Sequence, residues 1–206
     1  EIIIPSTIKK IGNDTFNGCT SLTIITIPQS VNTIGNNAFN GCTSLTKITI
    51  PSTIQTIGEN CFEGCTSIEL SEDMNEIPNN SFKGCHSLKE IIIPSTIKKI
   101  GNDTFNGCTS LTTITIPQSV NTIGNNAFSG CTSLTKLIIP STVQNIGENC
   151  FEGCIGLKQV MIDLYHTNIE KNTFNGCLPL KDIITRTSIT ENTKSSSLSE
   201  EEKEEI

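Results

Sequence analysis

Several residue types are scarce in this chain, and each scarcity excludes a class of function. The 206 residues include no Trp and only one Tyr, and their formal net charge of -7 argues against nucleic-acid binding. No stretch reaches the roughly 18 consecutive apolar residues of a membrane span, so we expect no membrane insertion within this segment. The segment begins without an initiator Met or a signal-peptide pattern, in the middle of an expected strand, and we expect it to be a fragment or processed form of a longer array.

Residues suited to catalysis are also scarce. The two His residues are His86, which directly follows Cys85, and His166, which lies in an irregular stretch at 163–168. A Cys-His pair without an orienting third residue is a poor candidate for a catalytic dyad. The sequence contains no glycine-rich phosphate loop and no paired acids. We therefore expect no enzyme, no cofactor and no metal site.

The dominant feature is a repeat of 23 residues. A Phe-x-Gly-Cys element recurs with steps of 23, 23, 20, 23, 23, 23 and 23 residues, at Phe16, Phe39, Phe62, Phe82, Phe105, Phe128, Phe151 and Phe174. A fixed period in this range predicts a solenoid of stacked units, whose function lies on an extended surface. Residues 1–65 and 90–154 differ at six positions, so a block of units has been duplicated.

Each part of the unit has a physical interpretation. Residues 45–50 alternate apolar and polar side chains and are rich in β-branched residues, which predicts a half-buried strand that Pro51 ends. One strand per unit predicts a parallel sheet. The segment around each Phe predicts a single helical or 3-10 turn, with Asn or Asp two residues before the Phe as a cap and Gly two residues after it. The Phe itself is expected to fill the core.

We expect the solenoid to span residues 1–185 in about eight repeats, one of them shortened at 63–82. The missing residues fall in the strand at 68–71, and we expect a break in the ladder there, with Glu72 and Asp73 near the gap. Residues 186–206 hold six Glu against one Arg and two Lys, for a net charge of -3. This Ser-rich acidic tail is predicted to be disordered or marginally helical.

Ten Cys residues raise the question of disulfides. Eight of them occupy the same slot in successive units, at Cys19, Cys42, Cys65, Cys85, Cys108, Cys131, Cys154 and Cys177. Stacked strands are about 4.8 Å apart, slightly too far for the Cβ spacing of about 3.8 Å that a disulfide needs. A buried thiol ladder is the simpler interpretation. Cys61 and Cys150 occupy the slot of Ala38 and Ala127 and are expected to be small buried residues.

This unit resembles the repeat of the BspA-like leucine-rich repeat family, L-x-x-I-x-I-P-x-x-V-x-x-I-G-x-x-A-F-x-x-C. The resemblance rests on residues 22–28, Ile34, Gly35 and residues 38–42 with their later copies, and covers about residues 2–185. It implies a parallel sheet on the concave face, with short strands, 3-10 turns or single helical turns on the other side. It also implies a surface or secreted protein of a bacterium or parasitic protist that takes part in adhesion.

The outward positions of the strands form the candidate binding surface. The central row is Ile3, Thr26, Thr49, Ile92, Thr115, Ile138, Met161 and Ile184, and the row two residues earlier is Ile24, Lys47, Glu90, Thr113, Lys136, Gln159 and Asp182. An apolar strip on a polar surface indicates an interaction site, although strands favour β-branched residues in any case. The candidate ligand-binding residues are Thr26, Lys47, Thr49, Glu90, Ile92, Thr115, Lys136, Ile138 and Met161.

Two classes of function remain. The first is a surface or secreted adhesion module that contacts a protein or glycan of a host or neighbouring cell, which sequons at Asn13, Asn79 and Asn102 on the turn edge would fit. The second is a cytoplasmic protein interaction scaffold, which unpaired thiols would favour. Self-association through an open N-terminal strand edge is a third option.

Overall fold

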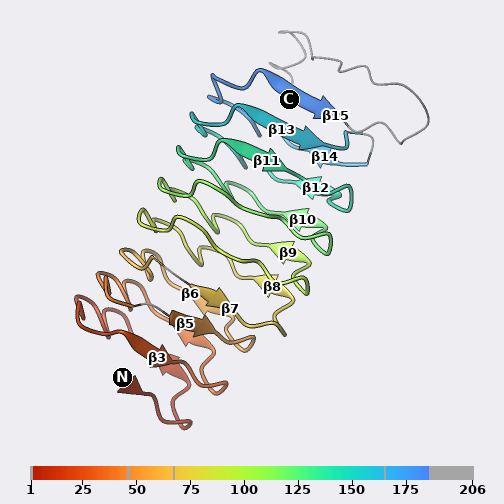
Figure 1. Ribbon diagram of the computed structural model, residues 1–206. Coiled ribbons are helices and arrows are strands. Elements are labelled where there is room, and N and C mark those ends of the chain that lie inside the picture. The colour runs from red at the N-terminus through yellow and green to blue at the C-terminus, as the bar shows by residue number, and fades with distance from the viewer. Residues whose placement is uncertain (1, 46, 67, 165, 186–206) are drawn as a thin grey trace.

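The computed structural model describes residues 2–45, 47–66, 68–164 and 166–185. Its units stack one on another from the N-terminal end to the C-terminal end (Figure 1), with no helix among these residues. The predicted repeat solenoid is confirmed. The predicted tail at 186–206 lies outside the described residues.

The first wall carries the longer strands. Their outward and inward positions alternate as the sequence predicts: Ile25 and Ile27 are buried, while Thr26 between them is exposed. All pairs are parallel, in the orders β1-β3-β5-β7 and β11-β13-β15. The strands are β1 (Ile2–Ile3), β3 (Ile24–Thr26), β5 (Lys47–Ile50), β7 (Glu69–Leu70), β11 (Lys136–Ile138), β13 (Gln159–Ile162) and β15 (Asp182–Thr185).

The second wall is built from two-residue strands, one in each unit, whose second residue is Ile. In nearly every unit this Ile points into the core, and Ile34, Ile100 and Ile146 are fully buried. The strands are β2 (Lys10–Ile11), β4 (Thr33–Ile34), β6 (Thr56–Ile57), β8 (Glu76–Ile77), β9 (Lys99–Ile100), β10 (Thr122–Ile123), β12 (Asn145–Ile146) and β14 (Asn168–Ile169). They form two parallel sheets, β2-β4-β6 and β8-β9-β10-β12-β14.

The segment before each Phe forms hydrogen-bonded turns. The Asn or Asp two residues before the Phe has a φ between 52° and 61° in every unit, so its role is to adopt the left-handed conformation that Asn and Asp tolerate best. The predicted capping role belongs to the residue before it. The Asn125 side-chain oxygen, for example, accepts a hydrogen bond from the backbone N–H of Glu148 in the next unit at 3.1 Å. The predicted positive-φ Gly after the Phe is confirmed, with φ between 67° and 85°.

The core is a continuous stack of Phe rings between the two walls. Successive ring centroids lie 5.1 to 5.9 Å apart, and the widest and most tilted step joins Phe62 to Phe82. The ladder thiols lie beside the rings. The Sγ of Cys131, for example, donates to the carbonyl oxygen of Phe105 in the preceding unit at 3.3 Å. Rings and thiols therefore tie each unit to its neighbour, as a solenoid requires.

The shortened unit disturbs both walls. On the first wall its Glu69 and Leu70 pair with Thr49 and Ile50 of the preceding unit, and the sheet ends there, so the predicted break in the ladder is confirmed. The Asp73 carboxylate, three residues after Leu70, accepts hydrogen bonds from Ser71 and from Ser52 of the preceding unit.

Both walls are interrupted on the C-terminal or N-terminal side of this unit. β7 is so short that it makes only a single bridge to the next unit, from Glu69 to Ile92, and the regular first-wall ladder resumes at β11. The burial pattern continues through this interval, with Ile114 and Ile116 buried and Thr115 exposed. On the second wall, β6 and β8 belong to different sheets.

Candidate functional site

The outward-facing residues at the centre of the first wall form a row that crosses the units, which we call the strand-face strip. Backbone pairing aligns Ile3 with Thr26, Thr26 with Thr49, Thr49 with Glu69, and Glu69 with Ile92. Ile138 aligns with Met161 further along. The strip consists of Ile3, Thr26, Thr49, Glu69, Ile92, Thr115, Ile138 and Met161.

The strip exposes apolar side chains that a folded protein usually buries. Ile3 and Ile92 are each 81% exposed, and Ile138 is 46% exposed. Of the eight exposed large apolar residues among the described ones, four lie on the first wall at outward positions: these three and Ile24. These four share the outward side of one wall, where Thr26, Thr49, Glu69 and Thr115 of the strip lie between them.

The flanking row supplies charge of both signs. Glu90 and Lys136 are exposed on the same wall. The backbone of Lys47 pairs with that of Ile24 on the same wall. Thr26 and Thr115 are exposed in the central row, while Thr49 and Met161 are half-buried. The structure thus places the predicted candidate residues on one wall, and their part in binding stays a prediction.

Glu69 is the strip residue that sequence reasoning missed. It occupies the middle of the row, between Thr49 and Ile92, and is exposed. The missing residues of the short unit made its strand look broken. The signal that would have found it is the alternation Ile68-Glu69-Leu70, in which both Ile68 and Leu70 are buried.

The Cys85-His86 pair has no accessible nucleophile. Cys85 is fully buried, and burial is the main cause that raises the pKa of its thiol well above the usual value. The His86 ring nitrogen Nδ1 lies 2.7 Å from the carbonyl oxygen of Gly107. A thiol that stays protonated in the core cannot act as a nucleophile at neutral pH.

In the described ranges, no group of three or more His, Cys, Asp or Glu side chains is placed to hold a metal ion. No helix in these ranges has the length and apolar character needed to cross a membrane.

Comparison with known proteins identifies the repeat. The model of the BspA type leucine-rich repeat region, in six copies, matches residues 1–74 and 75–199. No curated protein sequence shows significant similarity to the chain.

Solved structures of bacterial leucine-rich repeat proteins share the fold. One from Bacteroides ovatus is 34% identical with a TM-score of 0.72, over 89% of this chain but only 48% of its own. The T. pallidum leucine-rich repeat protein is 28% identical with a TM-score of 0.61, over 88% of this chain and 78% of its own. A leucine-rich cell surface protein from Faecalibacterium prausnitzii is 26% identical with a TM-score of 0.52, over 90% of this chain and 59% of its own. The chain thus spans about half the length of the Bacteroides protein.

Proposed function

Because the chain belongs to the BspA-type leucine-rich repeat family, we propose that it is a non-enzymatic protein-binding module that works at the cell surface or after secretion. The observation that carries this proposal is the strand-face strip. Its exposed Ile side chains lie in one row with Thr residues and Glu69 and are flanked by Glu90 and Lys136, so the wall offers apolar and polar contacts together, as protein interfaces do.

A protein suits this surface better than the alternative glycan ligand. Many glycan sites, like quaternary-ammonium sites, stack the ligand on an exposed aromatic face. Here the Phe rings form the core stack, and the chain has no Trp. Contact with a host or neighbouring cell through this strip is the adhesion role that we propose.

The buried thiols remove the main reason to favour a cytoplasmic scaffold. Unpaired cysteines in a secreted protein are usually a liability because they oxidise. Cys108 and Cys131 are fully buried, and each thiol donates to a Phe carbonyl of the preceding unit, at 3.1 and 3.3 Å. Burial is also the main cause that raises the pKa of both thiols. Such thiols are protected from oxidants, so they are compatible with a secreted or surface-exposed protein.

A double substitution in the strip tests this function. Replacing Ile92 and Ile138 by Glu puts charge at two exposed apolar contacts, and we expect at least about tenfold weaker binding, since each buried Ile is worth roughly 1.5–3 kcal/mol. The measurement is binding of labelled protein to immobilised fibronectin, laminin and collagen and to host cells. The melting temperature should stay within about 3 °C of wild type, because both side chains are exposed.

The matched control carries the same charge on the second wall, where Asn121 and Gln144 are exposed. The variant with both replaced by Glu should bind like wild type. If the Ile92 and Ile138 variant binds as well as wild type, the binding site lies elsewhere. If both variants lose binding equally, the effect is one of net charge and the strip is not the site.

A further inference from the structure

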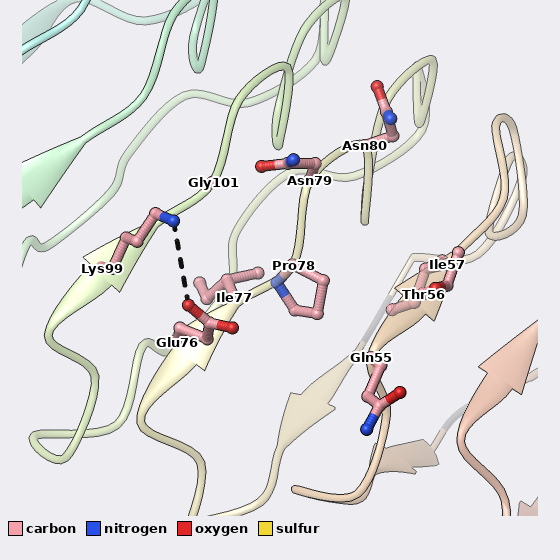
Figure 2. Close-up of a pocket in the computed structure, with 10 residues that line it drawn as sticks. All are labelled: Gln55, Thr56, Ile57, Glu76, Ile77, Pro78, Asn79, Asn80, Lys99 and Gly101. Carbon is pink, nitrogen blue, oxygen red and sulfur yellow. Dashed lines mark ion pairs between the residues drawn. The ribbon is translucent and has the colours of Figure 1, made fainter.

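The second wall contains a cleft that the strand-face strip does not use. It lies where β6 and β8 separate and has a volume of about 320 Å³, near the small end of the range for ligand sites. Figure 2 shows Gln55 and Thr56 on one side and Glu76, Pro78, Asn79 and Lys99 on the other. We call this space the β6-β8 cleft.

At the cleft, Pro78 cannot make a hydrogen bond that joins neighbouring units at the other steps of this wall, where a step is the contact between one unit and the next. In those steps, the residue after the buried Ile donates its backbone N–H to the Ile carbonyl of the preceding unit. Pro78 stands in this slot and has no N–H. The closing bonds are Gly35 to Ile11, Gly58 to Ile34, Gly101 to Ile77, Gly124 to Ile100 and Gly147 to Ile123, all at 2.9 Å, and Glu170 to Ile146 at 3.1 Å.

A second contact between units is also replaced at this step. In neighbouring units an Asn oxygen caps the next unit's backbone, as when Asn36 Oδ1 accepts from Glu59 N at 3.0 Å. In the unit before the cleft, Glu59 stands where the neighbouring units have the capping Asn. Its Oε1 forms an ion pair with Lys83 Nζ at 3.0 Å. Both the Pro and the Glu therefore remove backbone ties between β6 and β8.

The separation leaves β6 with a strand edge that faces the cleft. In the preceding unit, the carbonyls of Asn32 and Ile34 accept hydrogen bonds from Gln55 and Gly58, each at 2.9 Å. The equivalent carbonyls of β6 belong to Gln55 and Ile57. Within the described ranges, no backbone N–H donates to either of them. An open strand edge of this kind is a template for an added strand.

The side chains of the cleft leave main-chain recognition as its main chemistry. Glu76 and Lys99 lie 3.9 Å apart, so their charges offset each other and select neither a cation nor an anion. The remaining polar side chains of the lining are neutral, and no aromatic ring lines the cleft for a sugar to stack on. These polar side chains are Gln55, Thr56, Asn79 and Asn80.

We propose that the β6-β8 cleft binds an extended peptide, which adds a parallel strand to the edge of β6. Its backbone N–H groups donate to the carbonyls of Gln55 and Ile57. The two donors are three residues apart, as Gln55 and Gly58 are in the closed step. Gly is favoured at the second position, because a Cβ added at Gly58 would lie 2.3 Å from the backbone nitrogen of Asn36, although Glu170 occupies the equivalent slot of the last unit. Because the cleft lies on the wall opposite the strand-face strip, peptide binding here does not depend on the function proposed for the strip.

The chain itself supplies a probe. A labelled, acetylated and amidated peptide with the sequence of residues 119–125 contains the donors Asn121 and Gly124, which bond Lys98 and Ile100 at 2.9 Å in the closed wall. We expect saturable binding of this peptide to the full chain by fluorescence anisotropy. Methylating the backbone nitrogen of its Gly should weaken binding about tenfold, the effect of one lost hydrogen bond of about 1.4 kcal/mol.

The block duplication provides matched variants. Gln55→Trp fills the cleft. Gln144→Trp changes the equivalent residue of a closed step. There the carbonyl oxygen of Gln144 already accepts a hydrogen bond from the backbone N–H of Asn168 at 2.7 Å. We expect Gln55→Trp to bind the peptide at least tenfold more weakly and Gln144→Trp to bind like wild type. Pro78→Gly restores the missing N–H and should also weaken peptide binding, while raising the melting temperature.

Four results would overturn the peptide site. The first is no saturable binding to wild type at millimolar peptide. The second is equal affinity for wild type, Gln55→Trp and Pro78→Gly, and the third is no effect of N-methylation. The fourth is binding of a neutral oligosaccharide such as maltohexaose that Gln55→Trp abolishes, without binding of the peptide, which would make the cleft a sugar site.

Discussion

Raising the pH from 8 to 9.5 in the presence of a reductant should lower the free energy of unfolding by several kcal/mol. Burial raises the pKa of the Cys65 thiol to about 12, and burial also raises those of Cys61, Cys131 and Cys150. An unfolded Cys has a pKa of about 8.5. The folded chain therefore keeps protons that the unfolded chain releases.

The sign follows from proton linkage. A thiol whose pKa is higher in the folded state contributes stability that is complete below pH 8.5 and is lost as the pH rises toward the folded-state value, about 12 for Cys65. Between pH 8 and 9.5 each buried thiol costs about 1 kcal/mol, and the costs add across the ladder. Urea unfolding at half-unit steps of pH measures this slope.

Two conservative substitutions provide the control. Cys61 and Cys150 occupy the slot that holds buried Ala38 and Ala127 in other units, so replacing both by Ala should preserve the fold. The double variant should show a shallower decline, smaller by the contribution of two thiols. A flat profile for wild type, or the same slope for both proteins, would show that the thiols do not titrate with unfolding.

Phe128→Ala should cost about 3–5 kcal/mol of stability, the usual range for removing a buried aromatic ring. Phe128 is fully buried and stacks between Phe105 and Phe151, with ring centroids 5.1 and 5.2 Å away. Because solenoid stability is the sum of contacts between neighbouring units, one missing ring weakens two interfaces at once. Urea unfolding monitored by circular dichroism gives the difference.

Phe16→Ala is the matched comparison. Phe16 is only half-buried and stacks on one described neighbour, Phe39, at 5.2 Å. We expect it to cost about half as much as Phe128→Ala. Equal costs at the two positions, or a loss below about 1 kcal/mol at Phe128, would argue against the Phe stack as the main stabilising contact.

The repeat made most of the fold predictable. The spacing of Phe, Gly and Ile predicted stacked units, a parallel sheet and a Phe-filled core, because each slot has one physical role that recurs unchanged. The capping role was assigned to the wrong residue, since Asn is suited both to capping and to left-handed φ. Asn125 caps and its neighbour Asn126, with a φ of 54°, turns the chain.

The consequences of the short unit were harder to predict. Its three missing residues predicted a break in the first wall, and the sheet does end there, but Glu69 and Leu70 still pair with the preceding unit. The separation of β6 and β8 on the second wall was not predicted. The hydrogen bond that Pro78 cannot make there becomes visible only when the other units are compared. The candidate residues of the strip could be aligned by the repeat alone, but the repeat does not show what they bind.

Staining of the source cells with an antibody to this segment, with and without permeabilisation, tests the proposed surface role most directly. Signal on intact cells is the expected result, and it would place the strand-face strip where a host or neighbouring cell can reach it. Signal only after permeabilisation would contradict the surface role and favour an intracellular scaffold.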